Sequence, residues 1–342
     1  ARPGHRLIGT VRWIDKADKL RNRAAGGDVE VELFEVDIAD DESVRVGFER
    51  ILEATGRVDH LVNNAGVGGN AVAEECPTDL YLSVMNVNLC GAVRCIQAVL
   101  PQMRERRSGT IVNITSVAGR IAALAQSPYV ASKWAFEGLS EGLAQELAPF
   151  GIRVAIIEPG VTKSAIFAKN VDAPNSTGAY DAHYRRMFQF YMTGMANATD
   201  PFEVAEVIHE AITTEEHRLR YPVSWGGAEL AELHDRIDDS DWIAMGAIDE
   251  DEDYYRAYEH PFSFESHAWI EKGRRSPVPV CVMNAGYSSG WCEESFGMVL
   301  VASEVLCRAR GDEHCRFVMA TPGAIEGHVR AYREGRPHLA GR

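Results

Sequence analysis

Several features are missing from the sequence, and each absence excludes a class of protein. No apolar run approaches the roughly 20 residues that a helix needs to cross a bilayer. The N-terminus carries charge but lacks the apolar segment of a signal peptide. Positive charge is scarce, because 35 Lys and Arg residues stand against 50 Asp and Glu residues and leave a net charge of −15. We therefore expect neither a nucleic-acid nor a membrane partner.

Disulfide frameworks, internal repeats and Gly/Ser-rich or Pro-rich linkers are also absent from the sequence. The cysteine count is seven, which is odd, and the cysteines of the first half are scattered. Scattered thiols are typical of a reducing compartment, so we expect a cytoplasmic protein. The rest of the composition, 46% hydrophobic and 25% charged, is that of a globular chain long enough for two domains.

Strand and helix patterns alternate along most of the chain. Val-rich and Ile-rich strands are expected at 5–12, 28–37, 58–66, 109–116, 152–160 and 218–223. Helices are expected between them, at 16–25, 41–54, 80–103, 127–147 and 201–213. This alternation predicts an α/β fold with a doubly wound parallel sheet of the Rossmann type. The aromatic-rich stretch 161–199 is either a lid over a pocket or a pair of surface helices.

Tyr129 and Lys133 lie four residues apart at the start of a predicted helix, so they share one of its faces. An ammonium group beside a phenol favours the phenolate, and we expect it to lower the tyrosine pKa from about 10. A phenol tuned in this way exchanges a proton with a carbonyl or an alcohol near neutral pH. Taken alone, a Tyr-x-x-x-Lys pair is more often a chance pair of surface residues.

Further polar residues lie where neighbouring strands end. Ser116 ends a strand, 13 residues before Tyr129, and a hydroxyl there suits the same substrate oxygen. The segments "NNAG" at 63–66 and "EPG" at 158–160 end two other strands, and Asn88 lies inside a predicted helix. Ligands of doubly wound folds bind at the carboxyl edge of the sheet, so we expect one site there.

With these motifs in this order, residues 1–260 resemble the short-chain dehydrogenase/reductase family. The resemblance implies a catalytic Asn–Ser–Tyr–Lys set in which Asn88 orders a relay water and Ser116 orients the substrate. It implies that Tyr129 is the general acid/base, while Lys133 holds the cofactor ribose and tunes the tyrosine. The implied reaction moves a hydride between a nicotinamide cofactor and a ketone or secondary alcohol, which we expect to be a hydrophobic small molecule. Family members commonly associate, so a homo-oligomer is also implied.

The resemblance also implies which residues line the cofactor. Beyond Tyr129 and Lys133, these are Asp37, Ile38, Asn64, Ala65, Gly66, Pro159, Gly160 and Ser164, with Thr162 a less favoured substitute for Ser164. Arg12 directly follows a predicted strand, where a guanidinium group can pair with a 2′-phosphate, so NADP is favoured. Arg12 is alternatively an ordinary surface residue, which leaves NAD open.

The family's first strand and its Gly-rich phosphate-binding turn do not appear before "ARPGHRLIGTVR", and the chain begins at Ala1 without Met. We therefore expect a truncated piece of a longer gene product, whose fold lacks that strand and whose binding of NADPH is weak or absent. The alternative function is a catalytically silent reductase fused to a sensing or structural zinc domain.

The last quarter of the chain concentrates candidate metal ligands. Glu304 and Cys307 lie three residues apart, Cys315 follows, and Cys281 lies on a predicted facing strand. Three thiolates and a carboxylate can close a tetrahedral zinc site. Buried reduced cysteines are the simpler alternative. Substitute ligands are Cys292 and His314.

A second resemblance covers this region. Residues 262–325 resemble the 4-vinyl-reductase-like domain of aromatic-responsive transcriptional activators, through "AGYSSGW" at 285–291 and "EVLCRARGDEHCRF" at 304–317. The resemblance implies a structural zinc ion held by Cys281, Glu304, Cys307 and Cys315. We therefore expect a small α+β zinc-binding domain at 262–330, followed by a tail at 331–342.

Overall fold

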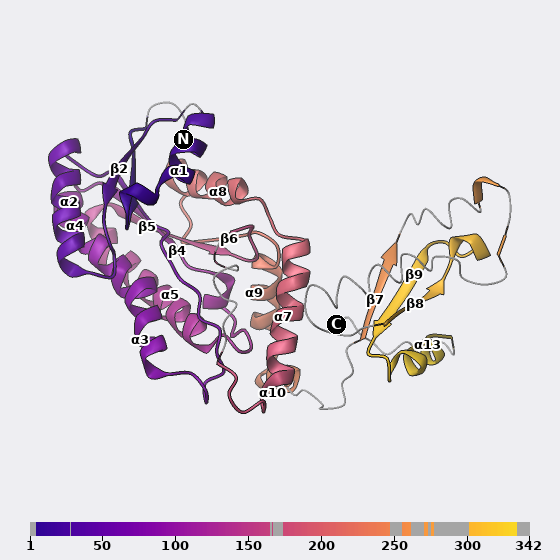
Figure 1. Ribbon diagram of the computed structural model, residues 1–342. Coiled ribbons are helices and arrows are strands. Elements are labelled where there is room, and N and C mark those ends of the chain that lie inside the picture. The colour runs from indigo at the N-terminus through magenta and orange to yellow at the C-terminus, as the bar shows by residue number, and fades with distance from the viewer. Residues whose placement is uncertain are drawn as a thin grey trace. The chain divides into compact units, whose positions relative to one another are not determined.

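The computed structural model describes residues 5–27, 29–164, 166, 174–246, 255–260, 270–272, 275–276 and 301–333. Residues 1–247 form one compact unit and residues 248–342 form a second. Among the described residues, the first unit contains parallel strands and helices, and the second contains an antiparallel sheet with a helix (Figure 1).

The first unit alternates strands and helices in the order that the sequence predicts. Its strands are β1 (Leu7–Val11), β2 (Val31–Glu35), β3 (His60–Asn63), β4 (Gly109–Ile114), β5 (Ile152–Pro159) and β6 (Arg220–Val223). Its helices are α1 (Asp18–Gly26), α2 (Asp41–Thr55), α3 (Thr78–Met85), α4 (Gly91–Arg106), α5 (Ser127–Leu147), α7 (Asp181–Ala196), α8 (Pro201–Thr213), α9 (Gly227–Arg236) and α10 (Asp239–Gly246). The prediction of an α/β fold is thus confirmed.

The parallel strands form two sheets and not one continuous sheet. Strand β1 pairs with β2, and the other strands follow the order β3-β4-β5-β6. Each neighbouring pair is parallel. Within the described residues, no hydrogen-bonded strand pair links β1 to β3. The carboxyl ends of β3, β4 and β5 lie at one edge, because these strands are parallel neighbours.

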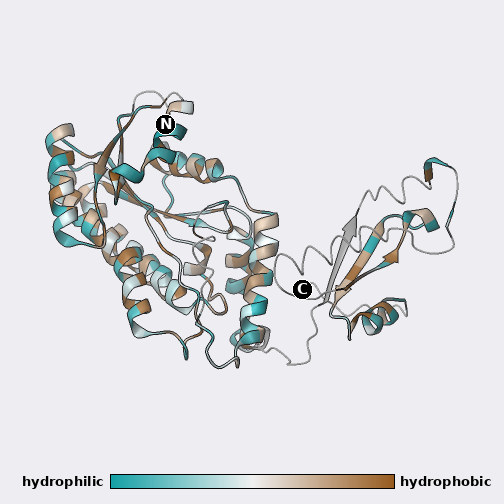
Figure 2. Cartoon of the chain, in the orientation of Figure 1, coloured by the Kyte–Doolittle hydropathy of each residue, from teal (hydrophilic) through white to brown (hydrophobic). Residues whose placement is uncertain are grey.

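Helices cover both faces of the four-stranded sheet. Ile111 and Val154 point to one face, where they pack with Phe48 of α2. The next residue along β4, Val112, points to the other face and packs with Ala211 of α8. Side chains alternate along a strand, so this pattern confirms a sheet that is wound on both sides. Figure 2 shows hydrophobic colour along the central strands between the helices.

Helices α3 and α4 join through a π-helical turn at Asn86–Cys90 into one long helix. The span Thr78–Arg106 has a mean hydropathy of 1.3 and is long enough to cross a membrane, which the sequence analysis did not expect. Within this unit, however, Val99 and Met103 of the helix are fully buried in the core against the sheet. Its apolar residues therefore have a place in the folded chain without a membrane.

The second unit contains β7 (Tyr255–His260), β8 (Val301–Leu306), β9 (Cys315–Ala320) and α13 (Ile325–Arg333). The strands form an antiparallel sheet in the order β7-β9-β8, and α13 packs on it through Ile325. Strand β7 pairs with β9 along its whole length, so it belongs to this unit although the sequence analysis placed the boundary at 260–262. The predicted ligand Cys281, its substitute Cys292 and the segment 285–291 lie outside the described residues.

Candidate active site

The start of α5 positions the predicted Tyr–Lys pair. Pro128 stands in the first turn of the helix, where its fixed φ suits helix initiation. Lys133 Nζ lies 5.7 Å from the centroid of the Tyr129 ring. The same ammonium donates a hydrogen bond of 2.9 Å to the carbonyl of Ile114, the last residue of β4. The two side chains therefore share a face at the carboxyl end of β4.

Ser116 links the ends of two strands to the phenol. Its Oγ accepts a hydrogen bond from the Ala118 amide at 3.1 Å and donates one to the Pro159 carbonyl at 3.3 Å, at the end of β5. Burial raises the pKa of the Tyr129 phenol, and a hydrogen-bonding interaction with Ser116 opposes that shift. The hydroxyl thus lies beside the tyrosine, as the sequence analysis expected.

Asn88 lies in the π-helical turn and is almost fully buried. Its Oδ1 accepts a hydrogen bond of 2.8 Å from the Val67 amide, and its Nδ2 donates bonds of 2.9 Å to the Val67 carbonyl and to Ser132 Oγ. The amide therefore ties the turn after β3 to α5. A Cβ atom on Gly66 of this turn would lie 3.3 Å from Asn88 Oδ1 and 3.9 Å from Lys133 Nζ. The turn thus passes close to both side chains.

The electrostatics of the tyrosine differ from the prediction. Burial raises the pKa of Tyr129, and the interaction with Ser116 only partly opposes this effect. The expectation that Lys133 lowers the tyrosine pKa is therefore wrong for the chain without ligands, since desolvation of the phenolate dominates. Burial lowers the pKa of Lys133 to about 8, and the negative charge of Glu137 opposes this shift.

The predicted adenine-side residues follow β1 and β2. Arg12 Nη1 lies 4.0 Å from Asp37 Oδ2, and the Arg12 guanidinium stacks 4.0 Å above the centroid of the Trp13 ring. Lys16 Nζ lies 4.3 Å from the same centroid. Sequence reasoning overlooked Trp13 and Lys16, although two cations flanking an aromatic residue were visible. Ile38 packs against Gly91, where a Cβ atom would lie 2.7 Å from Ile38 Cδ1.

The other predicted cofactor residues lie at strand ends. Asn64 and Ala65 are exposed in the turn after β3. Gly160 follows β5 and has no room for a side chain, because a Cβ atom would lie 2.1 Å from the Trp225 carbonyl oxygen. Ser164 is exposed. Its substitute, Thr162, shares a hydrogen bond of 2.8 Å with Ser224.

Helix α7 supplies residues that the sequence analysis placed only within an aromatic stretch. Tyr184 and Met187 pack with Val72 in a small apolar cluster, and the Tyr184 hydroxyl accepts a hydrogen bond of 3.0 Å from the Val72 amide. Tyr191 donates a hydrogen bond of 3.0 Å to Asn70, and its pKa is raised by burial and then by the charge of Tyr129. The helix therefore passes beside the phenol. Residues 165 and 167–173 of the aromatic stretch lie outside the described residues.

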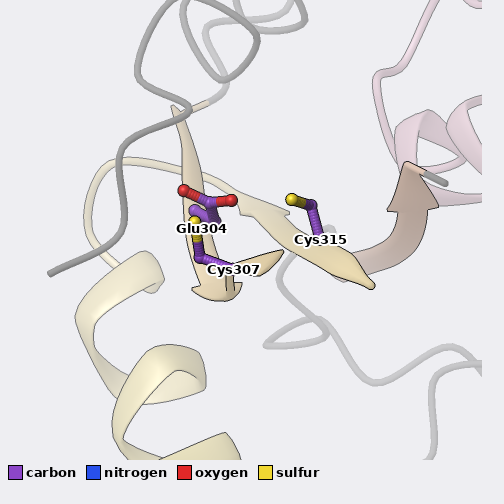
Figure 3. A group of neighbouring side chains, drawn as sticks. All are labelled: Glu304, Cys307 and Cys315. Carbon is purple, nitrogen blue, oxygen red and sulfur yellow. The ribbon is translucent and has the colours of Figure 1, made fainter. Parts of the chain in front are cut away.

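The second unit brings three of the four predicted metal ligands together. One ligand atom each from Glu304, Cys307 and Cys315 lies within 4.8 Å of the others, and all three residues are buried. Figure 3 shows Glu304 and Cys307 at one strand end and the Cys315 thiol across from them. The bulge between Glu304 and Leu306 interrupts the regular register of β8 next to these residues. Cys281, the fourth predicted ligand, lies outside the described residues.

Comparisons with known sequences agree with both parts of the chain. The sequence model of the short chain dehydrogenase family matches residues 1–175, and that of the 4-vinyl-reductase domain matches residues 268–321. The uncharacterized oxidoreductase YusZ of Bacillus subtilis is 34% identical over 228 residues, which are 64% of this chain and 81% of that protein. Human 17-beta-hydroxysteroid dehydrogenase type 1 is 38% identical over 197 residues, which are 56% of this chain and 60% of that protein.

Solved structures show the same fold. A short-chain dehydrogenase from Streptomyces avermitilis has a TM-score of 0.62 and 34% identity, and the match covers 71% of this chain and 88% of that one. An alcohol dehydrogenase from the archaeon Thermococcus sibiricus has a TM-score of 0.53 at 22% identity, covering 65% of this chain and 87% of that one, a likeness of fold alone.

Proposed function

Because the chain belongs to the short chain dehydrogenase family and also carries a 4-vinyl-reductase domain, we propose that it is an NADP(H)-dependent oxidoreductase. It transfers a hydride between the cofactor and a ketone or secondary alcohol. The observation that carries this proposal is the convergence of Ser116, Tyr129 and Lys133 at the carboxyl end of β4. Ligands of such sheets bind at this edge.

The side chains of the site have separate tasks in the proposed reaction. The dinucleotide supplies the hydride when bound. Tyr129 donates its phenolic proton to the carbonyl oxygen during reduction and takes a proton from the alcohol during oxidation. Ser116, beside the phenol, donates a hydrogen bond to the same oxygen. The Lys133 ammonium stabilises the phenolate that remains after proton transfer.

Asn88 acts on the shape of the site. Its side-chain amide forms two hydrogen bonds with Val67 and one with Ser132. These bonds fix the turn 64–66 against α5, and that turn would flank the cofactor. The small residues Ala65 and Gly66 leave room for a flat ligand on this exposed turn.

The residues after β1 fit NADP better than NAD. Arg12 and Lys16 both contact Trp13, so two cations stand beside one aromatic ring at the end of the strand. A guanidinium group matches the geometry of a phosphate and forms charge-assisted bonds with it. Arg12 is half-exposed and reaches solvent, where a 2′-phosphate can bind. These two residues support the choice of NADP.

A hydrophobic substrate is the class that fits α7. The helix carries Phe188 and Phe190, which are 38% and 36% exposed, on the same element as Tyr191. A human relative over part of the chain is a 17-beta-hydroxysteroid dehydrogenase, which supports an apolar ketone or alcohol here. We propose such a compound as the substrate.

The first prediction tests the general acid. Tyr129→Phe removes the proton that the proposed reaction needs, so ketone reduction falls by about 10²-fold or more. NADPH oxidation is followed by absorbance with a panel of apolar ketones. Tyr332→Phe, which removes a phenol hydroxyl in the other unit, is the matched control and keeps full activity. A Tyr129→Phe variant as active as the parent chain would refute the role of this phenol.

We also propose a structural zinc ion in the 4-vinyl-reductase unit, held by Glu304, Cys307 and Cys315. Two thiols and a carboxyl group that converge within 4.8 Å in a buried place match the donor types and the spacing of a zinc site. Bound there, the ion would cross-link β8 to the start of β9. Cys281 is proposed as the fourth ligand on the resemblance alone.

A further inference from the structure

A cluster of buried charges lies behind Lys133, and the proposed mechanism does not use it. Glu137 and Glu158 are only 5% and 2% exposed, yet both carry carboxyl groups. Burying a carboxylate costs several kcal/mol unless it is paired, and even a paired one rarely exceeds an apolar replacement in stability. Two such groups close to a catalytic lysine therefore need an explanation beyond stability.

Arg220 of β6 holds the two carboxylates together. Its Nε and Nη2 lie 3.2 Å and 3.1 Å from Glu137 Oε2, and its Nε lies 3.1 Å from Glu158 Oε1 on β5. Arg120 approaches the same Glu158 oxygen at 3.4 Å and contacts Asp235 of α9 at 3.1 Å. The ion pairs thus run from the interior to the surface.

Glu137 stands one helical turn beyond Lys133, so the two side chains share a face of α5. Burial raises the pKa of Glu137, and interactions with Thr115 and Arg220 oppose this shift and favour the carboxylate. The turn that holds Gly119 closes over this place, because a Cβ atom there would lie 2.9 Å from Glu137 Cγ and 3.0 Å from the Lys133 carbonyl oxygen. The carboxylate is therefore confined beside the lysine.

We propose that Glu137 is a positioning residue for the proposed reaction: held by Arg220, its carboxylate keeps the buried Lys133 side chain in the ammonium form beside Tyr129. The inference rests on the proposed function, since it assigns a task to a side chain that touches neither substrate nor cofactor. It explains why a costly buried charge stands at this position of α5. Burial lowers the pKa of Lys133, and the charge of Glu137 is what raises it against that effect.

Other charged groups face this cluster from every neighbouring element. They are Glu141 on α5, Glu158 on β5, Arg220 on β6, Arg120 after β4 and Asp235 on α9. Of these groups and Glu137, Glu137 is the one whose charge acts on the pKa of Lys133. Glu141 also pairs with Arg220 but is half-exposed, so it makes a matched control.

The titration of Lys133 can be measured without any catalytic assay. The chain has six lysines, so ¹⁵N-lysine labelling of the full chain gives few side-chain signals, and Lys133→Arg assigns the one in question. Glu137→Gln is expected to lower the pKa of Lys133 by about one unit or more, because an opposite charge within a few ångströms is lost. Glu137→Asp is expected to shift it less, and Glu141→Gln is expected to leave it unchanged.

Glu137→Met serves as a second neutral variant if the amide in Glu137→Gln disturbs folding, which circular dichroism reports. In active variants, the alkaline limb of ketone reduction moves to lower pH by the same amount, since the ammonium loses its proton earlier. A Lys133 titration that stays at the parent pH in folded Glu137→Gln or Glu137→Met overturns the inference. A parent chain that reduces no ketone refutes the proposed function instead, and the lysine titration still decides whether Glu137 acts on Lys133.

Discussion

Lys133 shows how one buried side chain links catalysis to stability. Burial lowers its pKa to about 8 in the folded chain, against an ordinary value of 10.5. Between these values the unfolded chain binds more protons, so stability rises with pH across this window. Below about pH 8 the ammonium is buried at a cost in stability. The site accepts this cost because the charged form is the one that stabilises a phenolate.

Arg12 is the residue at which cofactor choice can be tested. Arg12→Glu replaces the guanidinium beside Trp13 with a carboxylate that repels a 2′-phosphate. We expect the affinity for NADPH to fall about 10-fold or more, because a charge-assisted hydrogen bond contributes roughly 1.5–3 kcal/mol. The affinity for NADH is expected to change little. Both are measured by calorimetry.

Lys19→Glu makes the same charge change at an exposed position of α1 and controls for long-range effects. We expect it to leave the ratio of the two affinities unchanged. Equal losses of NADPH and NADH affinity in Arg12→Glu would contradict the assignment of the 2′-phosphate to Arg12.

Among the elements, α5 and α8 have the residue ranges that the sequence predicts, 127–147 and 201–213. Each begins with a proline in its first turn, a local signal that can be read without the fold. The long helix predicted at 80–103 is interrupted by the π-helical turn at Asn86–Cys90. That turn lies where Asn88 reaches across to Val67, a contact between distant segments that no local pattern reveals.

Helix α7 is held to the body of its unit by Tyr184. Tyr184→Phe leaves the buried Val72 amide without its hydrogen bond, so we expect a loss of about 1–3 kcal/mol in stability. Because the helix passes beside Tyr129, we also expect KM for the ketone to rise several-fold with little change in kcat. Chemical denaturation and steady-state kinetics measure these effects.

Tyr180→Phe is the matched control at the N-terminus of α7. Its hydroxyl bonds to the exposed Glu74, and such surface contacts contribute little. The role given to α7 would not survive if both variants behaved like the parent chain.

The whole molecule consists of two units with different architectures. The first is a parallel α/β unit, and the described strands of the second form an antiparallel sheet. Strands β1 and β3 each lie at the edge of a sheet, so the parallel strands of the first unit divide into two sheets. This division accords with the sequence expectation that one strand of the family's sheet does not appear in the chain.

The proposed zinc ion is tested on the full chain. We expect about one zinc per chain by elemental analysis and its loss in Cys307→Ser, because a thiolate ligand is removed. Cys90→Ser alters an exposed thiol in the first unit and keeps the metal. Chelation is expected to speed amide exchange in β8 and β9 while β4 and β5 stay protected. A parent chain that holds no zinc after growth with the metal would refute the site.

The sequence alone determined those features that depend on neighbours along the chain. The alternation of strands and helices follows from local periodicity, and the shared face of Tyr129 and Lys133 follows from their spacing on a helix. The position of Ser116 beside Tyr129 also follows, because parallel strands end at one edge. These features needed only short-range geometry.

The tertiary structure decided the energetics of the site. Glu137 and Arg220 are 83 residues apart in sequence, so their ion pair depends on the folding of β6 beside β5. The direction of the Tyr129 pKa shift likewise depends on how much water the fold removes from the phenol, which outweighs the spacing to Lys133. Burial and long-range pairing are properties of the packed chain, and for that reason the residue pattern did not contain them.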